Sequence, residues 1–324
     1  MAAPVSLPVS VVVLDDYQDV ALSIADWSPL SGRADVTRVA DHLDGEALVA
    51  RLAGAEVVVA MRERTPFPAD LLARLPRLRL LVTTGMANAA LDLAAAAARG
   101  VVVCGTAGGS AAAAELTWAL VMALARDVPA DDRAVRAGRW QENLGVELAG
   151  STLGLLGLGR IGAVVARYAR AFDMELLAWS ENLTAERAAE HGARLVDRAE
   201  LFAGSDVVSV HLRLSARTRG LVGPAELRLL GPGGRLVNTS RGPIVDEVAL
   251  LAALSAGTIA GAALDVFDVE PLPAGSPWRS APRTVLTPHV GYVSRQSYAA
   301  MYRQCVEDVV AWLDGAPVRV LSPA

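Results

Sequence analysis

Residues 151–163 read Ser-Thr-Leu-Gly-Leu-Leu-Gly-Leu-Gly-Arg-Ile-Gly-Ala. A short apolar run, typical of a strand, leads into Gly157, Gly159 and Gly162, and apolar residues at helical spacing follow over 161–172. In such a pattern the first glycine permits a tight turn, the second lets backbone N–H groups approach a pyrophosphate, and the third lets the helix pack closely on the strand. The stretch therefore predicts a dinucleotide-binding turn with phosphate at the helix N-terminus.

A second apolar run at 175–179 completes a strand–helix–strand unit around this turn. The alternative is an ordinary strand–helix turn, because a chain with 28 glycines can contain the pattern by chance. The complete unit favours the dinucleotide-binding interpretation.

Composition narrows the class of protein. The chain has 324 residues, 53% hydrophobic and 20% charged, which excludes a disordered chain and allows two domains. A net charge of −5 gives no reason to expect nucleic acid as a partner. Cys104 and Cys305 lack metal-ligand spacing, so neither a metal site nor a disulfide scaffold is expected. No targeting or membrane-spanning segment is visible, and we expect a cytoplasmic protein.

Every basic residue of the chain is arginine. Pyridoxal and Schiff-base enzymes need a lysine nucleophile, and the dehydrogenases that use Tyr-x-x-x-Lys or another catalytic lysine need one too. These classes are excluded.

Strands and helices alternate along the whole chain, which predicts parallel sheets with helical crossovers. The strands expected in a first α/β region cover 9–14, 36–40, 56–60, 78–83 and 101–104. A long Ala-rich helix is expected over 110–126, followed by a polar, irregular or partly helical segment over 127–144, and the domain junction is expected in this region. The strands expected in a second region cover 152–156, 175–179, 207–211, 235–238, 259–263 and 284–286, and a final helix covers 296–313.

Polar residues follow three strands of the second region, at the ends where ligands bind in an open α/β sheet. They include Arg241, Glu270 and His289. An arginine can bind a carboxylate through two parallel hydrogen bonds, a histidine can give or take a hydroxyl proton, and a glutamate can orient that histidine. Taken singly, each residue has a structural alternative: a surface ion pair, a loop residue or a buried hydrogen-bonded imidazole. Together they predict reversible hydride transfer to a carbonyl that carries a carboxylate, with no metal.

Further motifs accompany the glycine turn in order along the chain. They are Val210-His-Leu212, Val237-Asn-Thr-Ser-Arg-Gly-Pro-Ile-Val-Asp246, Ala263-Leu-Asp-Val-Phe-Asp-Val-Glu-Pro271 and Thr287-Pro-His-Val-Gly291. With these motifs the sequence resembles the D-isomer-specific 2-hydroxyacid dehydrogenase family over nearly its whole length. The resemblance implies an α/β fold of two doubly wound domains: a Rossmann dinucleotide-binding domain over 116–295 and a flavodoxin-like substrate domain made of 1–115 and 296–324.

The resemblance also implies an activity and a role for individual residues. It implies an NAD(P)-dependent oxidoreductase acting on a 2-keto acid or D-2-hydroxy acid, and a homodimer is expected. Arg241 would bind the substrate carboxylate, His289 would be the acid/base, and Glu270 would support His289. Asp265 would contact the nicotinamide carboxamide. The expected cofactor-binding residues are Gly157, Gly159, Arg160, Ile161, Gly162, Ser180, Glu181, His211, Arg213, Thr239, Ser240 and Asp265. The expected substrate-binding residues are Gly85, Met86, Ala87, Arg241 and His289.

The chain departs from the family pattern at two places. The first-domain loop usually carries Gly-x-Gly-x-Asp-Asn, whereas this chain has Thr84-Gly-Met-Ala-Asn-Ala-Ala90, so the substrate side of the pocket is changed. Where most members have a proline after His-x, this chain has Arg213, which we expect near the adenosine.

The residue expected to choose between NAD and NADP is also unusual. An acidic residue normally binds the adenosine ribose in NAD enzymes, and the corresponding place here is Ser180, followed by Glu181. Glu181 disfavours a 2′-phosphate and Arg213 favours one. We expect NAD, with only a modest preference over NADP.

Other functions are open within this family. Some relatives are corepressors that bind NADH and act through partners, and formate and phosphite dehydrogenases are also related. Formate dehydrogenases characteristically replace the glutamate partner of the histidine, which this chain keeps as Glu270. A turnover screen of 2-keto acids with both reduced cofactors would separate an enzyme from a cofactor-sensing protein.

Overall fold

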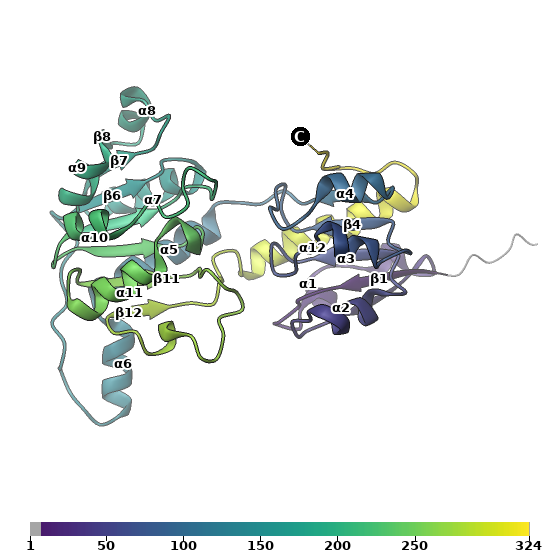
Figure 1. The fold of residues 1–324 in the computed structure, drawn as a ribbon, viewed down its shortest axis with the longest axis horizontal. Coiled ribbons are helices and arrows are strands. Elements are labelled where there is room, and N and C mark those ends of the chain that lie inside the picture. Colours follow the sequence, from purple (N-terminus) through teal and green to yellow (C-terminus); the bar gives the residue numbers. More distant parts are fainter. Residues whose placement is uncertain (1–7, 324) are drawn as a thin grey trace, which may run out of the picture. The chain divides into compact units, whose positions relative to one another are not determined.

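The structure is a computed structural model and describes residues 8–323 (Figure 1). The chain divides into two compact units. The first unit comprises the chain up to Gly109 together with the chain from Val293 onward, and the second unit comprises Ser110–Tyr292. Each unit is built on one parallel sheet with helices on both faces. Among the described residues, no helix is both long and apolar enough to cross a membrane.

The first unit contains a five-stranded parallel sheet with the order β2-β1-β3-β4-β5. Its strands are β1 (Val9–Val13), β2 (Ala34–Arg38), β3 (Val57–Ala60), β4 (Leu80–Thr83) and β5 (Val102–Gly105). The interior strands β3 and β4 are buried along their whole length, as expected for strands covered by helices on both faces. This strand order is that of the flavodoxin-like doubly wound fold, so the predicted fold class is confirmed for this unit.

Helices from both ends of the chain cover this sheet. They are α1 (Ala21–Ile24), α2 (Gly45–Leu52), α3 (Ala69–Ala73), α4 (Leu93–Ala98) and α12 (Arg295–Leu313), with a 3-10 turn η1 (Ser28–Leu30). Helix α12 contacts β4 and β5 and buries Tyr302, Cys305 and Val309. The tail that follows it pairs with β5 through an antiparallel bridge between Cys104 and Val320.

The second unit contains a seven-stranded parallel sheet with the order β12-β11-β10-β9-β6-β7-β8. Its strands are β6 (Thr152–Leu156), β7 (Glu175–Trp179), β8 (Arg194–Leu195), β9 (Val207–Val210), β10 (Arg235–Asn238), β11 (Gly261–Leu264) and β12 (Thr284–Leu286). The first six in chain order follow the Rossmann arrangement, and β12 extends it. The chain reverses its winding direction between β6 and β9, which places the glycine turn at the topological switch point.

Two hydrophobic cores lie on the two faces of this sheet. One contains side chains of α5 (Ala111–Ala125), α7 (Arg160–Ala171) and α8 (Ala185–Glu190). The other contains side chains of α9 (Arg198–Ala203), α10 (Pro224–Leu230) and α11 (Glu247–Ala256). Short 3-10 turns η2 (Gly242–Ile244) and η3 (Pro277–Ser280) precede α11 and β12.

The expected strands are all present, with ends shifted by at most two residues. The prediction of six strands in the second region was incomplete, because β8 has only two residues and its Arg194 is exposed, so it carries no apolar pattern. The segment 127–144 contains a regular helix α6 (Val128–Arg136) followed by chain without regular structure. In Figure 1 this helix and the following segment extend away from the sheet of their own unit.

Candidate active site

The glycine turn has the geometry that a dinucleotide requires. Gly157 has φ +105°, and a side chain there would meet the backbone of His211 at 2.8 Å. A Cβ atom on Gly162 would lie 2.4 Å from the carbonyl oxygen of Gly157, so helix α7 packs directly on the turn. Gly159, by contrast, has open space beside it and begins α7 without a side-chain cap. The helix N-terminus is therefore accessible to an anionic group, and the turn fits a pyrophosphate.

His211 lies directly against this turn, at the end of β9. Its Nε2 atom is 2.9 Å from the hydroxyl of Ser209. Burial lowers the pKa of His211 to about 4, because charge on the ring is not solvated there. The imidazole is therefore neutral near pH 7 and supports the turn by packing.

The pair predicted for proton transfer is present. The Nδ1 atom of His289 and the Oε2 atom of Glu270 are 2.5 Å apart, and the Oε1 atom of Glu270 accepts a hydrogen bond from the backbone N–H of Phe267 at 2.8 Å. The two side chains are 22% and 31% exposed, so the pair remains accessible to a small molecule. The hydrogen bond to Nδ1 leaves Nε2 of His289 as the atom that can exchange a proton with a ligand.

Asp265 accepts hydrogen bonds from the loop that contains His289. It follows β11 and is 1% exposed. Its Oδ1 atom accepts hydrogen bonds from Thr287 Oγ1 at 2.6 Å and from the N–H of Val290 at 2.8 Å, and its Oδ2 atom accepts one from the N–H of Gly291 at 2.8 Å. Desolvation raises the pKa of Asp265 despite these bonds. The carboxylate therefore braces the loop on both sides of His289, whose own φ is +53°.

The loop after β10 positions Arg241. The side chain of Asn238 donates to the carbonyl oxygen of Arg241 at 3.0 Å and accepts from the N–H of Ser240 at 3.0 Å. The hydroxyl of Ser240 donates to the carbonyl oxygen of Leu212, and Nη1 of Arg241 donates to the carbonyl oxygen of Ser240 at 2.7 Å. These bonds join the ends of β9 and β10.

A buried threonine on α5 supports the same loop. The hydroxyl of Thr117 lies 2.7 Å from that of Thr239. Sequence reasoning missed Thr117 and Asn238 as supporting residues. Asn238 carried a signal, because a buried asparagine at a strand end needs hydrogen-bond partners. Thr117 carried none within its Ala-rich helix.

The predicted residues follow strands of both sheets. Arg241, Glu270 and His289 follow β10, β11 and β12, which are neighbours in one parallel sheet, so all three belong to its carboxyl edge. Ser180 and the exposed Glu181 follow β7, and the exposed Arg213 follows β9. Gly85, Met86 and Ala87 follow β4 in the first unit.

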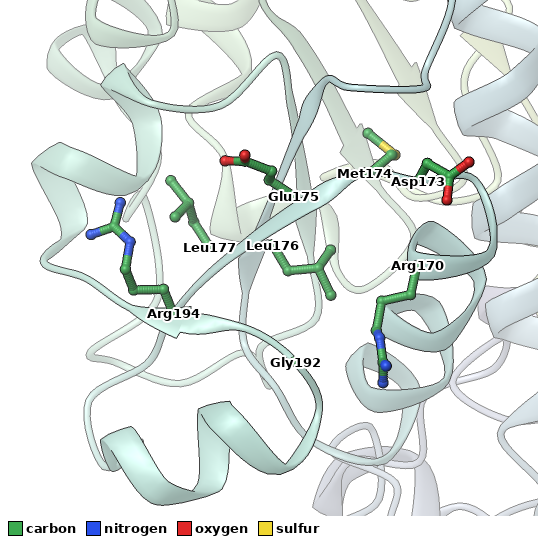
Figure 2. A pocket seen from close by; sticks show the side chains of 8 residues that line it. All are labelled: Arg170, Asp173, Met174, Glu175, Leu176, Leu177, Gly192 and Arg194. Carbon is green, nitrogen blue, oxygen red and sulfur yellow. The ribbon is translucent and has the colours of Figure 1, made fainter.

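A surface hollow of about 530 Å³ lies at the opposite edge of the second unit's sheet (Figure 2). Its lining includes Arg170, Glu175, Gly192 and Arg194, near the amino ends of β7 and β8. None of the predicted site residues lines it. Because ligands of open α/β sheets bind at the carboxyl ends of the strands, we do not assign the active site to this hollow.

Comparison with known proteins identifies the class to which this fold and site belong. Residues 118–291 match the family model described as "D-isomer specific 2-hydroxyacid dehydrogenase, NAD binding domain". The chain belongs to the D-isomer specific 2-hydroxyacid dehydrogenase family. The predicted family and its NAD-binding domain are thus confirmed. The predicted fold and the predicted class, that of hydroxyacid oxidoreductases, are confirmed as well.

Individual relatives cover different shares of their own length. A glyoxylate reductase of Aeropyrum pernix is 41% identical over 256 residues, which are 76% of this chain and 76% of the relative. A D-3-phosphoglycerate dehydrogenase of Archaeoglobus fulgidus is 36% identical over 85% of this chain, but the alignment spans only 52% of that protein. The solved structure of a phosphoglycerate oxidoreductase from Vibrio cholerae is 38% identical, with a TM-score of 0.90 over 95% of this chain and 100% of the other.

Proposed function

We propose that the protein is an NAD(H)-dependent oxidoreductase that reduces a 2-keto acid or oxidises the corresponding D-2-hydroxy acid. The observation that carries this proposal is the hydrogen-bonded pair of Glu270 and His289, at the same edge as Arg241 in an NAD-binding domain. Relatives named glyoxylate reductase and D-3-phosphoglycerate dehydrogenase support it, since both names describe chemistry on 2-keto or 2-hydroxy acids.

In the proposed reaction each residue has one task. Arg241 binds the substrate carboxylate through its guanidinium group. His289 donates a proton from Nε2 to the carbonyl oxygen during reduction, and Glu270 holds Nδ1 and stabilises the protonated ring. A nicotinamide cofactor held in this domain would supply or accept the hydride. The backbone of Gly85, Met86 and Ala87 contributes to substrate binding.

We propose that the cofactor is held by the glycine turn and by the loops that follow β7, β9, β10 and β11. Gly157, Gly159, Arg160, Ile161 and Gly162 would hold the pyrophosphate. The other residues assigned to cofactor binding are Ser180, Glu181, His211, Arg213, Thr239, Ser240 and Asp265. All three hydrogen bonds of Asp265 go to its own chain, so a contact with the carboxamide would use a remaining lone pair of the carboxylate. Glu181 favours NAD over NADP.

The test is a turnover screen of glyoxylate, pyruvate and longer 2-keto acids with NADH and NADPH. We expect reduction of at least one 2-keto acid. Tight NADH binding without turnover of any of them would contradict the proposal and would favour a cofactor-sensing protein that acts through a partner.

We also propose that the protein is a homodimer that uses α6 and the segment after it. Four apolar side chains there are strongly exposed: Val128 (54%), Val135 (55%), Trp140 (76%) and Leu144 (94%). Such a patch on an extended arm favours burial against a second copy of the chain. Sedimentation of wild type and of the double variant Trp140→Ser, Leu144→Ser tests this: the wild type should be dimeric and the variant monomeric. We propose a cytoplasmic location, which suits the free, buried Cys104 and Cys305.

A further inference from the structure

The loop 84–90 of the first unit carries two adjacent backbone donors. Among residues 8–323, the N–H groups of Met86 and Ala87 donate to no other group of the chain. Met86 is 48% exposed and Ala87 is exposed as well. Neighbouring backbone N–H groups bind an anion well only when the loop conformation is held in advance.

The backbone before these donors is tightly enclosed. Gly85 has φ +142°, and a Cβ atom there would lie 2.3 Å from Nη1 of Arg62. A Cβ atom on Gly105 would lie 2.5 Å from the carbonyl oxygen of Gly85. The Arg62 side chain and the end of β5 therefore confine the start of the loop.

Arg62 is bonded to the same place. Its backbone N–H donates to the hydroxyl of Thr84 at 2.9 Å, and its Nη1 donates to the carbonyl oxygen of Thr84 at 3.2 Å. Arg62 has φ +53°, a left-handed conformation that a non-glycine residue adopts only when its surroundings hold it there.

Asn88 closes the other end of the loop with one partly buried amide. Its Nδ2 atom donates to the carbonyl oxygen of Arg62 at 2.6 Å and to the hydroxyl of Thr83 at 2.9 Å, and its Oδ1 atom accepts from the N–H of Ala90 at 2.9 Å. One side chain thus joins the segment after β3, the end of β4 and the end of the loop. Met86 and Ala87 lie between the two braced points.

We propose that Asn88 is a positioning residue. Its amide holds the backbone of Met86 and Ala87 so that their N–H groups are ready to bind the substrate carboxylate. This inference rests on the proposed function. Since Asn88 acts through the loop and not on the proton relay or the cofactor, its loss should weaken substrate binding and leave the chemical step and NADH binding in place.

The decisive variant is Asn88→Asp, which is nearly isosteric. It keeps the acceptor for the N–H of Ala90 but removes the donor to the carbonyl of Arg62 and places negative charge there. We expect KM for the best 2-keto acid to rise roughly ten- to a hundred-fold, because displaced N–H groups of Met86 and Ala87 would lose hydrogen bonds to the charged carboxylate of the substrate. The kcat value and the Kd of NADH should stay within about threefold. Hydrogen exchange at 84–90 should become faster. Asn88→Ala should behave similarly, and Gln296→Glu, an exposed amide-to-acid change in the same unit, should change nothing.

Two results would overturn the assignment. One is an unchanged KM, whether or not hydrogen exchange in the loop becomes faster. The other is a rise in KM accompanied by equally large losses of kcat and of NADH affinity, which would indicate general damage to the fold.

A wild type that reduces no 2-keto acid would defeat the proposed function, and a separate readout then decides the role of Asn88. Oxamate, a carboxylate-bearing analogue of a 2-keto acid, should slow exchange of the Met86 and Ala87 amides in the presence of NADH in the wild type and not in Asn88→Asp. Equal protection in both proteins, or in neither, would contradict the positioning role.

Discussion

At the scale of single residues, the candidate site is a set of reactive groups held by neighbours that do not react. His289 is paired with Glu270. Asp265 accepts a hydrogen bond from the Thr287 hydroxyl before His289 and from the backbone N–H groups of Val290 and Gly291 after it. Arg241 extends from a loop that Asn238 bonds at two points. Changes to the reactive groups should therefore alter catalysis while the fold remains intact.

The Glu270→Gln variant tests the proton relay. An amide cannot stabilise the positive charge on His289 as a carboxylate does, and reduction requires the protonated ring. The pH at which the rate of keto-acid reduction falls to half its maximum should move to a lower value. The measurement is kcat/KM for reduction against pH. An unchanged profile would remove Glu270 from the mechanism, and the exposed Glu175→Gln serves as the control.

The Arg241→Lys variant tests carboxylate binding. It keeps the positive charge, but an ammonium group cannot form the two parallel hydrogen bonds of a guanidinium. Losing a charged hydrogen bond of about 1.5 to 3 kcal/mol should lower kcat/KM roughly ten- to over a hundred-fold. Arg235→Lys, at the other end of β10, should keep wild-type activity. Nearly full activity of Arg241→Lys would show that the carboxylate binds elsewhere.

Two exposed residues should decide the choice of cofactor. Glu181 carries a charge that disfavours a 2′-phosphate, and Arg213 carries one that favours it. We expect Glu181→Ala to shift the preference toward NADPH and Arg213→Ala to shift it toward NADH. Dissociation constants for both reduced cofactors measure this. A wild type that binds NADPH much more tightly than NADH would contradict the assignment of NAD.

At the scale of elements, the contact between β6, the glycine turn and α7 has almost no spare room. Each of the three glycines in the turn meets a different steric requirement. Gly157 has a positive φ, Gly162 lies against the carbonyl of Gly157, and Gly159 leaves open space at the helix N-terminus. Substitutions of Gly162 and Gly159 should therefore differ in their effects on stability and on cofactor binding.

Alanine at Gly162 should weaken both the fold and cofactor binding. Its Cβ would lie 2.4 Å from a backbone oxygen, so α7 must move, at a cost of about 1 to 3 kcal/mol. We expect a lower Tm and an NADH Kd raised roughly ten- to over a hundred-fold. Gly159→Ala should raise Kd while keeping Tm, because its Cβ meets nothing in the protein.

Gly233→Ala is the matched control, since its Cβ also meets nothing and the residue lies in a turn away from the cofactor. It should change neither Tm nor Kd. A wild-type Kd for Gly159→Ala would indicate that the pyrophosphate does not approach this glycine.

At the scale of the whole molecule, different parts of the candidate site belong to two parallel sheets with different strand orders. The seven-stranded sheet carries the dinucleotide turn and the His–Glu pair, and the five-stranded sheet carries the braced loop at Gly85. The chain builds the five-stranded unit from both of its ends, with α12 packed on β4 and β5. Stability then depends on buried groups in each unit.

The partly buried His211 beside the glycine turn should make stability depend on pH. The pKa of His211 is about 4 in the folded protein and about 6.5 in an unfolded chain. Between these values the unfolded chain holds one more proton, so the free energy of unfolding falls as pH falls, by about 1.4 kcal/mol per pH unit. The Tm of the wild type should therefore fall more steeply from pH 6.5 to 4 than that of His211→Gln. His191→Gln, outside the site at the end of α8, should follow the wild type. Parallel curves for wild type and His211→Gln would contradict the lowered pKa of His211.

The sequence alone determined the α/β class, eleven of the twelve strands found within residues 8–323, and the candidate residues of the dinucleotide turn and the His–Glu pair. This was possible because these features are local: a strand is an apolar run, the turn needs glycine at fixed spacing, and proton transfer needs particular side-chain types. The tertiary structure decided β8, the bonds of Asp265, the neutral state of His211, and the bracing by Asn238, Thr117 and Asn88. Each of these features depends on hydrogen-bond partners or on burial that distant parts of the chain provide. The residues next to it in the sequence indicate neither the partners nor the burial.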